Sequence, residues 1–199
     1  MKSSPPEYSA RGLTDMPAPY NASNILRLAL IPYFKTNGRL PMIRGIHHVA
    51  VHVRDLERML KFYQEAFGFE LVGEQFSWGG EPVLDQLLDV PGSAARGCML
   101  RAGTCYLEMF QFSAPEPLST RPLRPFDKGY THFCVDVTDI EQEYARLSAL
   151  GMTFGHPAPI DMGHVKSIYG RDPEGNVIEI QQTAGNCDFR LDKLPAVAN

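Results

Sequence analysis

Two stretches of the sequence decide the fold: HVAVHVRDLE at residues 48–57 and HFCVDVTDIE at residues 132–141. Each begins with a histidine and then places an apolar residue at every second position, a pattern that favours a β-strand. Each also carries Val-x-Asp followed by Leu or Ile and then Glu, in which the aspartate can cap a helix. Glycines Gly68 and Gly151 follow the two predicted helices at nearly the same distance from the histidines. The same strand, cap and helix therefore occur twice.

Further strand-like runs follow each repeated segment. They span 70–75, 97–101 and 106–112 in the first half, and 166–169 and 177–182 in the second. The sequence therefore predicts an α+β fold of two tandem βαβββ modules that form a curved mixed sheet. The predicted boundaries are an N-terminal extension (1–41), the first module (42–114), a linker (115–129), the second module (130–183) and a C-terminal tail (184–199). An insertion at 77–95 is predicted to contain a short helix with Pro82 in its first turn.

The composition excludes several classes of function. The chain has 199 residues, of which 44% are hydrophobic, and a net charge of −4, so it has no basic surplus for binding nucleic acid. No apolar run approaches the roughly 20 residues that a membrane helix needs, and no membrane partner is expected. The cysteines form no CxxC pair and are interpreted as buried thiols in a reducing compartment, with the cytoplasm as the expected location.

Each half places a histidine early in its first predicted strand and a glutamate within its last. These residues are His48 and Glu108 in the first half, and His132 and Glu179 in the second. A carboxylate inside YLEMF (106–110) or VIEI (177–180) is costly to bury unpaired, and a metal ion is one good reason for its presence. Because the pair is repeated, we interpret the four as ligands of one divalent ion rather than as isolated structural residues. Nitrogen and carboxylate donors suit Zn, Ni, Co, Mn or Fe(II), and this set does not choose among them.

Taken together with Asp-Pro-Glu-Gly-Asn at 172–176, these motifs resemble the vicinal oxygen chelate superfamily, the group of glyoxalase I, methylmalonyl-CoA epimerase and type I extradiol dioxygenases. The resemblance covers about residues 44–183. It implies paired βαβββ modules around a metal that chelates neighbouring oxygens of a small-molecule substrate. The family's four ligand positions match His48, Glu108, His132 and Glu179. The resemblance also implies a homodimer, and it leaves open whether the site forms within one chain or across two.

The resemblance implies three alternative functions. Glyoxalase-like isomerases and epimerases stabilise an enediolate or enolate while a glutamate moves the proton, so we expect a glyoxalase I-like, metal-dependent lyase or isomerase with Glu108 or Glu179 as the acid/base. An Fe(II) extradiol ring-cleavage dioxygenase is the alternative, although Glu108 would then occupy a position needed by catecholate or oxygen. A third alternative is a non-catalytic, bleomycin-resistance-like binding protein, but such proteins lack the metal residues. Gly92 and Ser93 stand where methylmalonyl-CoA epimerase would have its second catalytic glutamate, which counts against that two-base reaction.

Three more residues are predicted to contact substrate. His52 shares a strand face with His48, and Tyr106 and Phe110 flank Glu108 on its own strand face. The alternatives are a structural histidine and ordinary core aromatics.

Overall fold

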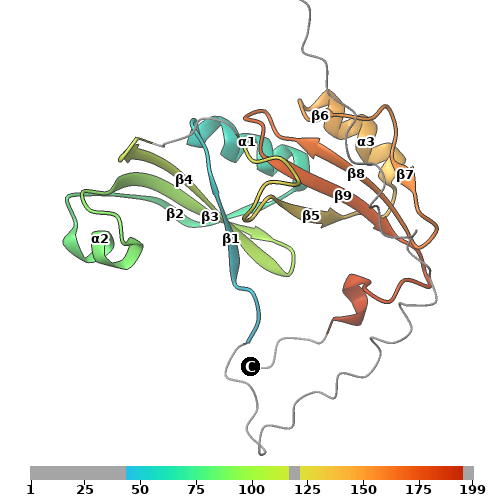
Figure 1. Ribbon diagram of the computed structural model, residues 1–199, viewed down its shortest axis with the longest axis horizontal. Coiled ribbons are helices and arrows are strands. Elements are labelled where there is room, and N and C mark those ends of the chain that lie inside the picture. Colours follow the sequence, from blue (N-terminus) through green and yellow to red (C-terminus); the bar gives the residue numbers. More distant parts are fainter. Residues whose placement is uncertain (1–43, 117–121, 195–199) are drawn as a thin grey trace, which may run out of the picture. The chain divides into compact units, whose positions relative to one another are not determined.

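A computed structural model describes residues 44–116 and 122–194 (Figure 1). The predicted N-terminal extension at 1–41, residues 42–43 of the predicted first module, residues 117–121 of the linker and residues 195–199 of the tail lie outside this part. The first module contains β1 (His48–His52), α1 (Leu56–Phe67), β2 (Glu70–Gly79), α2 (Pro82–Leu88), β3 (Ala94–Ala102) and β4 (Cys105–Ala114). The second contains β5 (His132–Asp136), α3 (Ile140–Ala149), β6 (Thr153–Phe154), β7 (Ile160–Asp161), β8 (Val165–Arg171) and β9 (Val177–Thr183), followed by a 3-10 turn, Leu191–Lys193.

Each module forms its own mixed sheet, and both sheets are visible in Figure 1. The strand order is β1-β4-β3-β2 in the first and β5-β9-β8-β6 in the second, where β7 also pairs with β8. In both sheets the first strand runs parallel to the last, while the other pairs are antiparallel. The predicted α+β class and the two βαβββ modules are confirmed. The short strands β6 and β7 were not predicted, and they pair with β8 where β2 pairs with β3.

The two long helices begin as the repeated aspartates predict. The Asp55 side chain accepts a hydrogen bond from Arg58 N at the start of α1, and Asp139 accepts one from Gln142 N at the start of α3. These bonds satisfy backbone donors that have no partner within the helix. Gly68 ends α1 with a φ of 65°, a left-handed conformation that glycine adopts without a steric penalty. The predicted helix in the insertion is confirmed as α2, with proline at its first position. None of the helices in the described residues is long and apolar enough to span a bilayer.

The two modules share one apolar core. Leu56, Met59 and Tyr63 of α1 belong to the same buried cluster as Ile140 of α3 and Ile178 of β9. Burial of such side chains is the main source of stability, at about 1.5–3 kcal/mol for each large apolar group. The second module is therefore packed against the first and is not an independent unit.

Polar groups in the β8–β9 turn fasten it to the first module. The buried Tyr63 hydroxyl donates to Asp172 Oδ2 at 2.9 Å, and burial together with the charge of Asp172 raises the pKa of Tyr63 well above its usual range. Glu174 accepts hydrogen bonds from Arg54 N at 2.6 Å and Asp55 N at 2.9 Å. This turn thus fixes the connection between β1 and α1, and with it the end of the strand that carries His48.

Candidate metal centre

The first predicted ligand pair, His48 and Glu108, lies on neighbouring strands. β1 and β4 are parallel, with Ala50 opposite Glu108, so the His48 ring projects from the same face of the sheet as the carboxylate. His48 Nε2 lies 3.3 Å from Glu108 Oε2. The other ring nitrogen, Nδ1, is 3.0 Å from Nδ1 of His47. Nε2 is therefore the nitrogen that faces the carboxylate.

The second pair, His132 and Glu179, repeats this arrangement. β5 and β9 are parallel, with Cys134 opposite Glu179, which is the register of Ala50 and Glu108. His132 Nε2 lies 3.4 Å from Glu179 Oε2, and Nδ1 is 3.0 Å from Thr131 Oγ1. The same backbone pairing thus produces the same histidine–glutamate contact in both modules.

The spacing within each pair fits two ligands of one divalent ion. Two donors held about 2.1 Å from a metal are about 3.0 Å apart at an octahedral angle and about 3.4 Å apart at a tetrahedral one. The two observed separations, 3.3 and 3.4 Å, lie within this range. The glutamate side chains are each 18% exposed, whereas those of His48 and His132 are 41% and 28% exposed. Each pair therefore combines a largely covered carboxylate with an accessible imidazole.

The four predicted ligands form two separate half-sites. We call His48 with Glu108 half-site 1, and His132 with Glu179 half-site 2. Within residues 44–116 and 122–194, no three His, Cys, Asp or Glu side chains gather closely enough to hold one metal ion. β1 and β5, which carry the histidines, are each the end strand of their sheet. A mononuclear centre made from all four residues stays a prediction, and within the described residues their side chains lie in two separate pairs.

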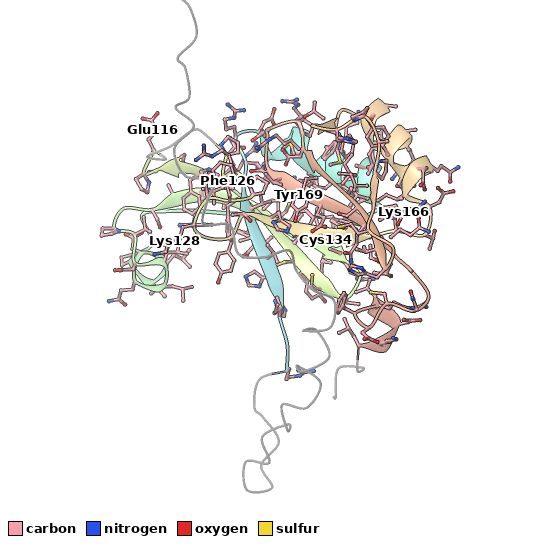
Figure 2. All side chains as sticks on the ribbon, turned by 45° about the vertical axis from the view of Figure 1, so that its right-hand side comes forward. Glu116, Phe126, Lys128, Cys134, Lys166 and Tyr169 are labelled. Atoms are coloured by element: carbon pink, nitrogen blue, oxygen red, sulfur yellow. The ribbon has the colours of Figure 1, made fainter. Side chains whose placement is uncertain are left out.

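Half-site 2 includes two residues that the sequence did not indicate, Ser167 and Tyr169 of β8. Ser167 Oγ donates to Glu179 Oε1 at 2.5 Å, and the Tyr169 hydroxyl is 3.3 Å from His132 Nε2. Figure 2 shows Tyr169 and Cys134 over the second sheet and Lys166 at its outer side, where Lys166 pairs with Glu141 of α3. Alternation along a strand could have placed Ser167 and Tyr169 on one face, but only the β8–β9 register brings that face to Glu179.

Two groups beside Glu179 keep their protons at neutral pH. Cys134 is exposed and is therefore not one of the buried thiols predicted from the sequence, but desolvation of its sulfur and the negative charge of Glu179 raise its pKa to about 12. The same two causes raise the pKa of Tyr169. The predicted donors of half-site 2 are the His132 imidazole and the Glu179 carboxylate, whose contact is the one described above.

Comparison with known proteins agrees with this arrangement of modules. The sequence profile of the Glyoxalase/Bleomycin resistance protein/Dioxygenase superfamily matches residues 45–180, which include both modules. The chain belongs to this superfamily. The resemblance predicted from the repeated motifs is therefore confirmed.

Two curated relatives of this chain have names that describe different reactions. A 2-epi-5-epi-valiolone epimerase from Actinomyces sp is 31% identical over 161 residues, which cover 77% of this chain and 87% of the relative. A lactoylglutathione lyase from Schizosaccharomyces pombe is 28% identical over 141 residues, which cover 68% of this chain and 46% of the relative. The chain thus spans most of the first relative and about half of the second.

Solved structures of the superfamily have the same fold. A glyoxalase family protein from Bacillus cereus superimposes with a TM-score of 0.64 at 20% identity, covering 75% of this chain and 99% of the other. One from Enterococcus faecalis gives a TM-score of 0.51 at 26% identity, covering 69% and 96%.

Of the three residues predicted to contact substrate, His52 and Phe110 lie beside Phe112, whereas Tyr106 lies beside His47. His52 Nε2 accepts a hydrogen bond from Phe112 N at 3.3 Å, and burial lowers the pKa of His52 although Glu174 opposes this shift. Phe110 belongs to an aromatic cluster with Phe76, Trp78 and Phe112, with ring centres 5.7–6.0 Å from its own. Tyr106 packs instead against His47, with ring centres 5.0 Å apart. Contact of all three with substrate stays a prediction.

A cavity of about 320 Å³ lies between β1 and the segment that leads into β5. Its lining includes His52, Arg54, His132 and Glu174. The two predicted catalytic glutamates, Glu108 and Glu179, are not part of this lining. The cavity therefore reaches the imidazole of half-site 2 without containing a complete centre.

Proposed function

We propose that this protein is a metal-dependent isomerase or epimerase that moves a proton at a carbon next to a carbonyl group in a small oxygenated substrate. The observation that carries the proposal is the pair of half-sites, each with a histidine Nε2 within 3.4 Å of a glutamate oxygen. The relationship to an epimerase and to a lyase supports this class of reaction.

The proposed chemistry needs one carboxylate base and a means of stabilising negative charge. Glu108 or Glu179 takes the proton from carbon, the C–H electron pair forms a carbon–carbon double bond, and the carbonyl electrons move onto oxygen. A divalent ion held by His48, His132 and the carboxylates would supply positive charge that stabilises the enediolate or enolate. Return of the proton to the neighbouring carbon isomerises the substrate, and return to the opposite face of the same carbon epimerises it.

The test combines metal content with exchange of the substrate's proton. Protein without a histidine tag, loaded with divalent metals, is expected to hold about one ion per chain by emission spectroscopy. With 2-epi-5-epi-valiolone in D2O, mass spectrometry should show one deuterium gained, and Glu108→Gln with Glu179→Gln in one chain should abolish the gain. Absence of bound metal under replete conditions would overturn the proposal. Rapid oxygen consumption with catechols after anaerobic Fe(II) loading would instead favour the dioxygenase.

We propose that a second copy of the chain completes the four-ligand metal centre. Within the described residues the half-sites do not combine, and the end strands β1 and β5 each leave one edge without a strand partner. Such edges are natural places for pairing with another chain. In a two-fold dimer, half-site 1 of each copy would meet half-site 2 of the other, giving two equal centres.

Mixing two inactive variants tests this assembly. His48→Ala breaks half-site 1 and His132→Ala breaks half-site 2, so neither homodimer has an intact centre. After random chain exchange, about one quarter of the wild-type metal and activity should return, because half of the dimers are mixed and each has one intact centre. Mixing His48→Ala with Glu108→Ala should restore nothing, since both changes lie in half-site 1. Failure of the first mixture to recover, with exchange verified, would contradict assembly across two chains.

A further inference from the structure

The carboxylate of half-site 2 is held in place by a buried hydroxyl. Ser167 is 6% exposed, and its Oγ donates to Glu179 Oε1 at 2.5 Å. The other oxygen, Oε2, faces His132 Nε2 at 3.4 Å. One oxygen of Glu179 is therefore committed to Ser167, and its partner points toward the imidazole with which it would share a metal.

The first module cannot provide the same support for Glu108. In the second module Glu179 pairs with Tyr169, and Ser167 pairs with Gln181. In the first module Glu108 pairs with Met99, and Gly97 pairs with Phe110, so Gly97 is the counterpart of Ser167.

A side chain at Gly97 would collide with its surroundings. A Cβ there would lie 2.6 Å from Met109 O and 2.9 Å from the Phe76 ring. In the part of the chain that the structure describes, the recorded polar partner of Glu108 is His48 alone. Among residues 44–116 and 122–194, no donor therefore restrains the second oxygen of Glu108.

We infer that Ser167 is a positioning residue that fixes Glu179 as a metal ligand, and that Glu108 is the carboxylate that carries the substrate's proton. The inference rests on the proposed function and assigns different tasks to its two glutamates. A hydrogen bond from a hydroxyl to a carboxylate is strong and orients the group, and such outer contacts set the geometry of metal ligands. A carboxylate that carries a proton must instead be free to move, because its oxygen has to approach carbon, accept a proton and release it.

The reaction balances with this division of tasks. A Glu108 oxygen takes the proton from the carbon next to the carbonyl, and the C–H electron pair shifts as the carbonyl electrons move onto oxygen. The proton then moves from Glu108 to the former carbonyl carbon, where the double-bond electrons form the new C–H bond, and the neighbouring hydroxyl becomes the new carbonyl as its proton passes to the adjacent oxygen. Glu179 stays ionised throughout, and Ser167 keeps its proton.

Titration with Mn²⁺, followed by the electron paramagnetic resonance signal of the free ion, tests the role of Ser167. Ser167→Ala should weaken Mn²⁺ binding by about 10- to 100-fold, as is typical when a group that supports a ligand is removed. Ser167→Thr, which keeps the hydroxyl, should bind within a few-fold of wild type and serves as the second variant if Ser167→Ala folds poorly. Ser148→Ala is the matched control, because Ser148 Oγ bonds only to Tyr144 O on α3 among its recorded partners.

Two glutamine variants test the division between the glutamates. Glu179→Gln should lose Mn²⁺ binding, whereas Glu108→Gln should bind Mn²⁺ within about tenfold of wild type and lose deuterium exchange into 2-epi-5-epi-valiolone by at least about 100-fold. Wild-type binding by Ser167→Ala would overturn the inference, as would exchange retained in Glu108→Gln or equal loss of Mn²⁺ in both glutamine variants. If the wild-type chain bound neither Mn²⁺ nor another divalent ion, the proposed function itself would be wrong. This result is distinct from metal binding by the wild type without the expected differences among the variants, which would contradict only the inference.

Discussion

The two modules repeat the backbone contacts that connect strand to helix. In the first, the side chain of Gln111 accepts a hydrogen bond from Leu56 N at 3.0 Å, and in the second Gln182 accepts one from Ile140 N at the same distance. Both glutamines lie three residues beyond the glutamate of their half-site. The parallel strand pair, the helix start and the histidine–glutamate contact thus recur as one unit.

The modules differ in what surrounds this unit. The first has the ten-residue strand β2 and the added helix α2. Phe110, on the same strand as its glutamate, belongs to an aromatic cluster. The second has the two-residue strands β6 and β7, with Ser167 and Tyr169 beside its glutamate. The modules are therefore alike in the strand pair and the helix start and differ in the elements and side chains around each glutamate, as the proposed division of tasks between the half-sites requires.

The largest expected effect on stability concerns the β8–β9 turn of the second module, whose side chains bond to the first module. Asp172, 3% exposed, accepts hydrogen bonds from Tyr63 Oη, Glu174 N, Asn176 N and Asn176 Nδ2. Asp172→Ala should lower the free energy of unfolding by about 3–5 kcal/mol, because a buried network loses its acceptor. Urea denaturation measures this loss. Thr104→Ala, in the exposed β3–β4 turn of the first module, should change little, and a comparable loss there would remove the contrast.

The second-largest expected effect concerns Gly97, where the first module has no space for a side chain equivalent to that of Ser167. Gly97→Ala should lower the free energy of unfolding by about 1–3 kcal/mol, as overpacking typically does, since the added Cβ meets the backbone oxygen of Met109. Gly155→Ala is the matched control in the second module, because nothing lies within 4 Å of its Cβ position. Thermal unfolding of the two variants would compare them, and a neutral Gly97→Ala would mean that a hydroxyl could be accommodated beside Glu108 after all.

The repeated unit could be predicted from the sequence because its signals are local. Alternating apolar residues, an aspartate at a helix start and a glycine after the helix each act within a few residues. The positions of His48 and Glu108 within their strands follow from the same alternation. This was enough to predict the modules and the helix caps, whereas the contact of each histidine with the glutamate of its own module depends on the parallel strand pairs β1–β4 and β5–β9.

The differences between the modules depend on contacts that are distant in sequence. Ser167 reaches Glu179 only through the β8–β9 register, which the geometry of the turn at 172–176 sets. Glu174 bonds to backbone groups 119 and 120 residues away, and no local pattern encodes that. Strands as short as β6 and β7 leave no periodicity to detect.

A smaller and equal effect is expected from the two helix caps. Asp55→Ala and Asp139→Ala should each lower the free energy of unfolding by about 1 kcal/mol, the usual cost of removing a cap. Urea denaturation of both variants, with Asp188→Ala as an exposed control, would measure it. A distinctly larger loss for Asp55→Ala would show that the bond from its backbone to Glu174 also depends on the aspartate side chain.

The smallest effect distinguishes two ion pairs that look equivalent. Arg96 pairs with Glu57 at 3.2 Å, and Lys166 pairs with Glu141 at 2.6 Å. Arg96 also donates from Nε and Nη2 to Gln111 Oε1, the oxygen that accepts Leu56 N, whereas no such contact to Gln182 is recorded for Lys166 among the described residues. Exposed ion pairs contribute little and are screened by salt. Lys166→Ala should therefore leave the urea midpoint unchanged within experimental error. Arg96→Ala and Arg96→Lys should both lower the midpoint, and 1 M NaCl should not remove this decrease. A loss confined to low salt would mean that Arg96, like Lys166, acts only through its charge.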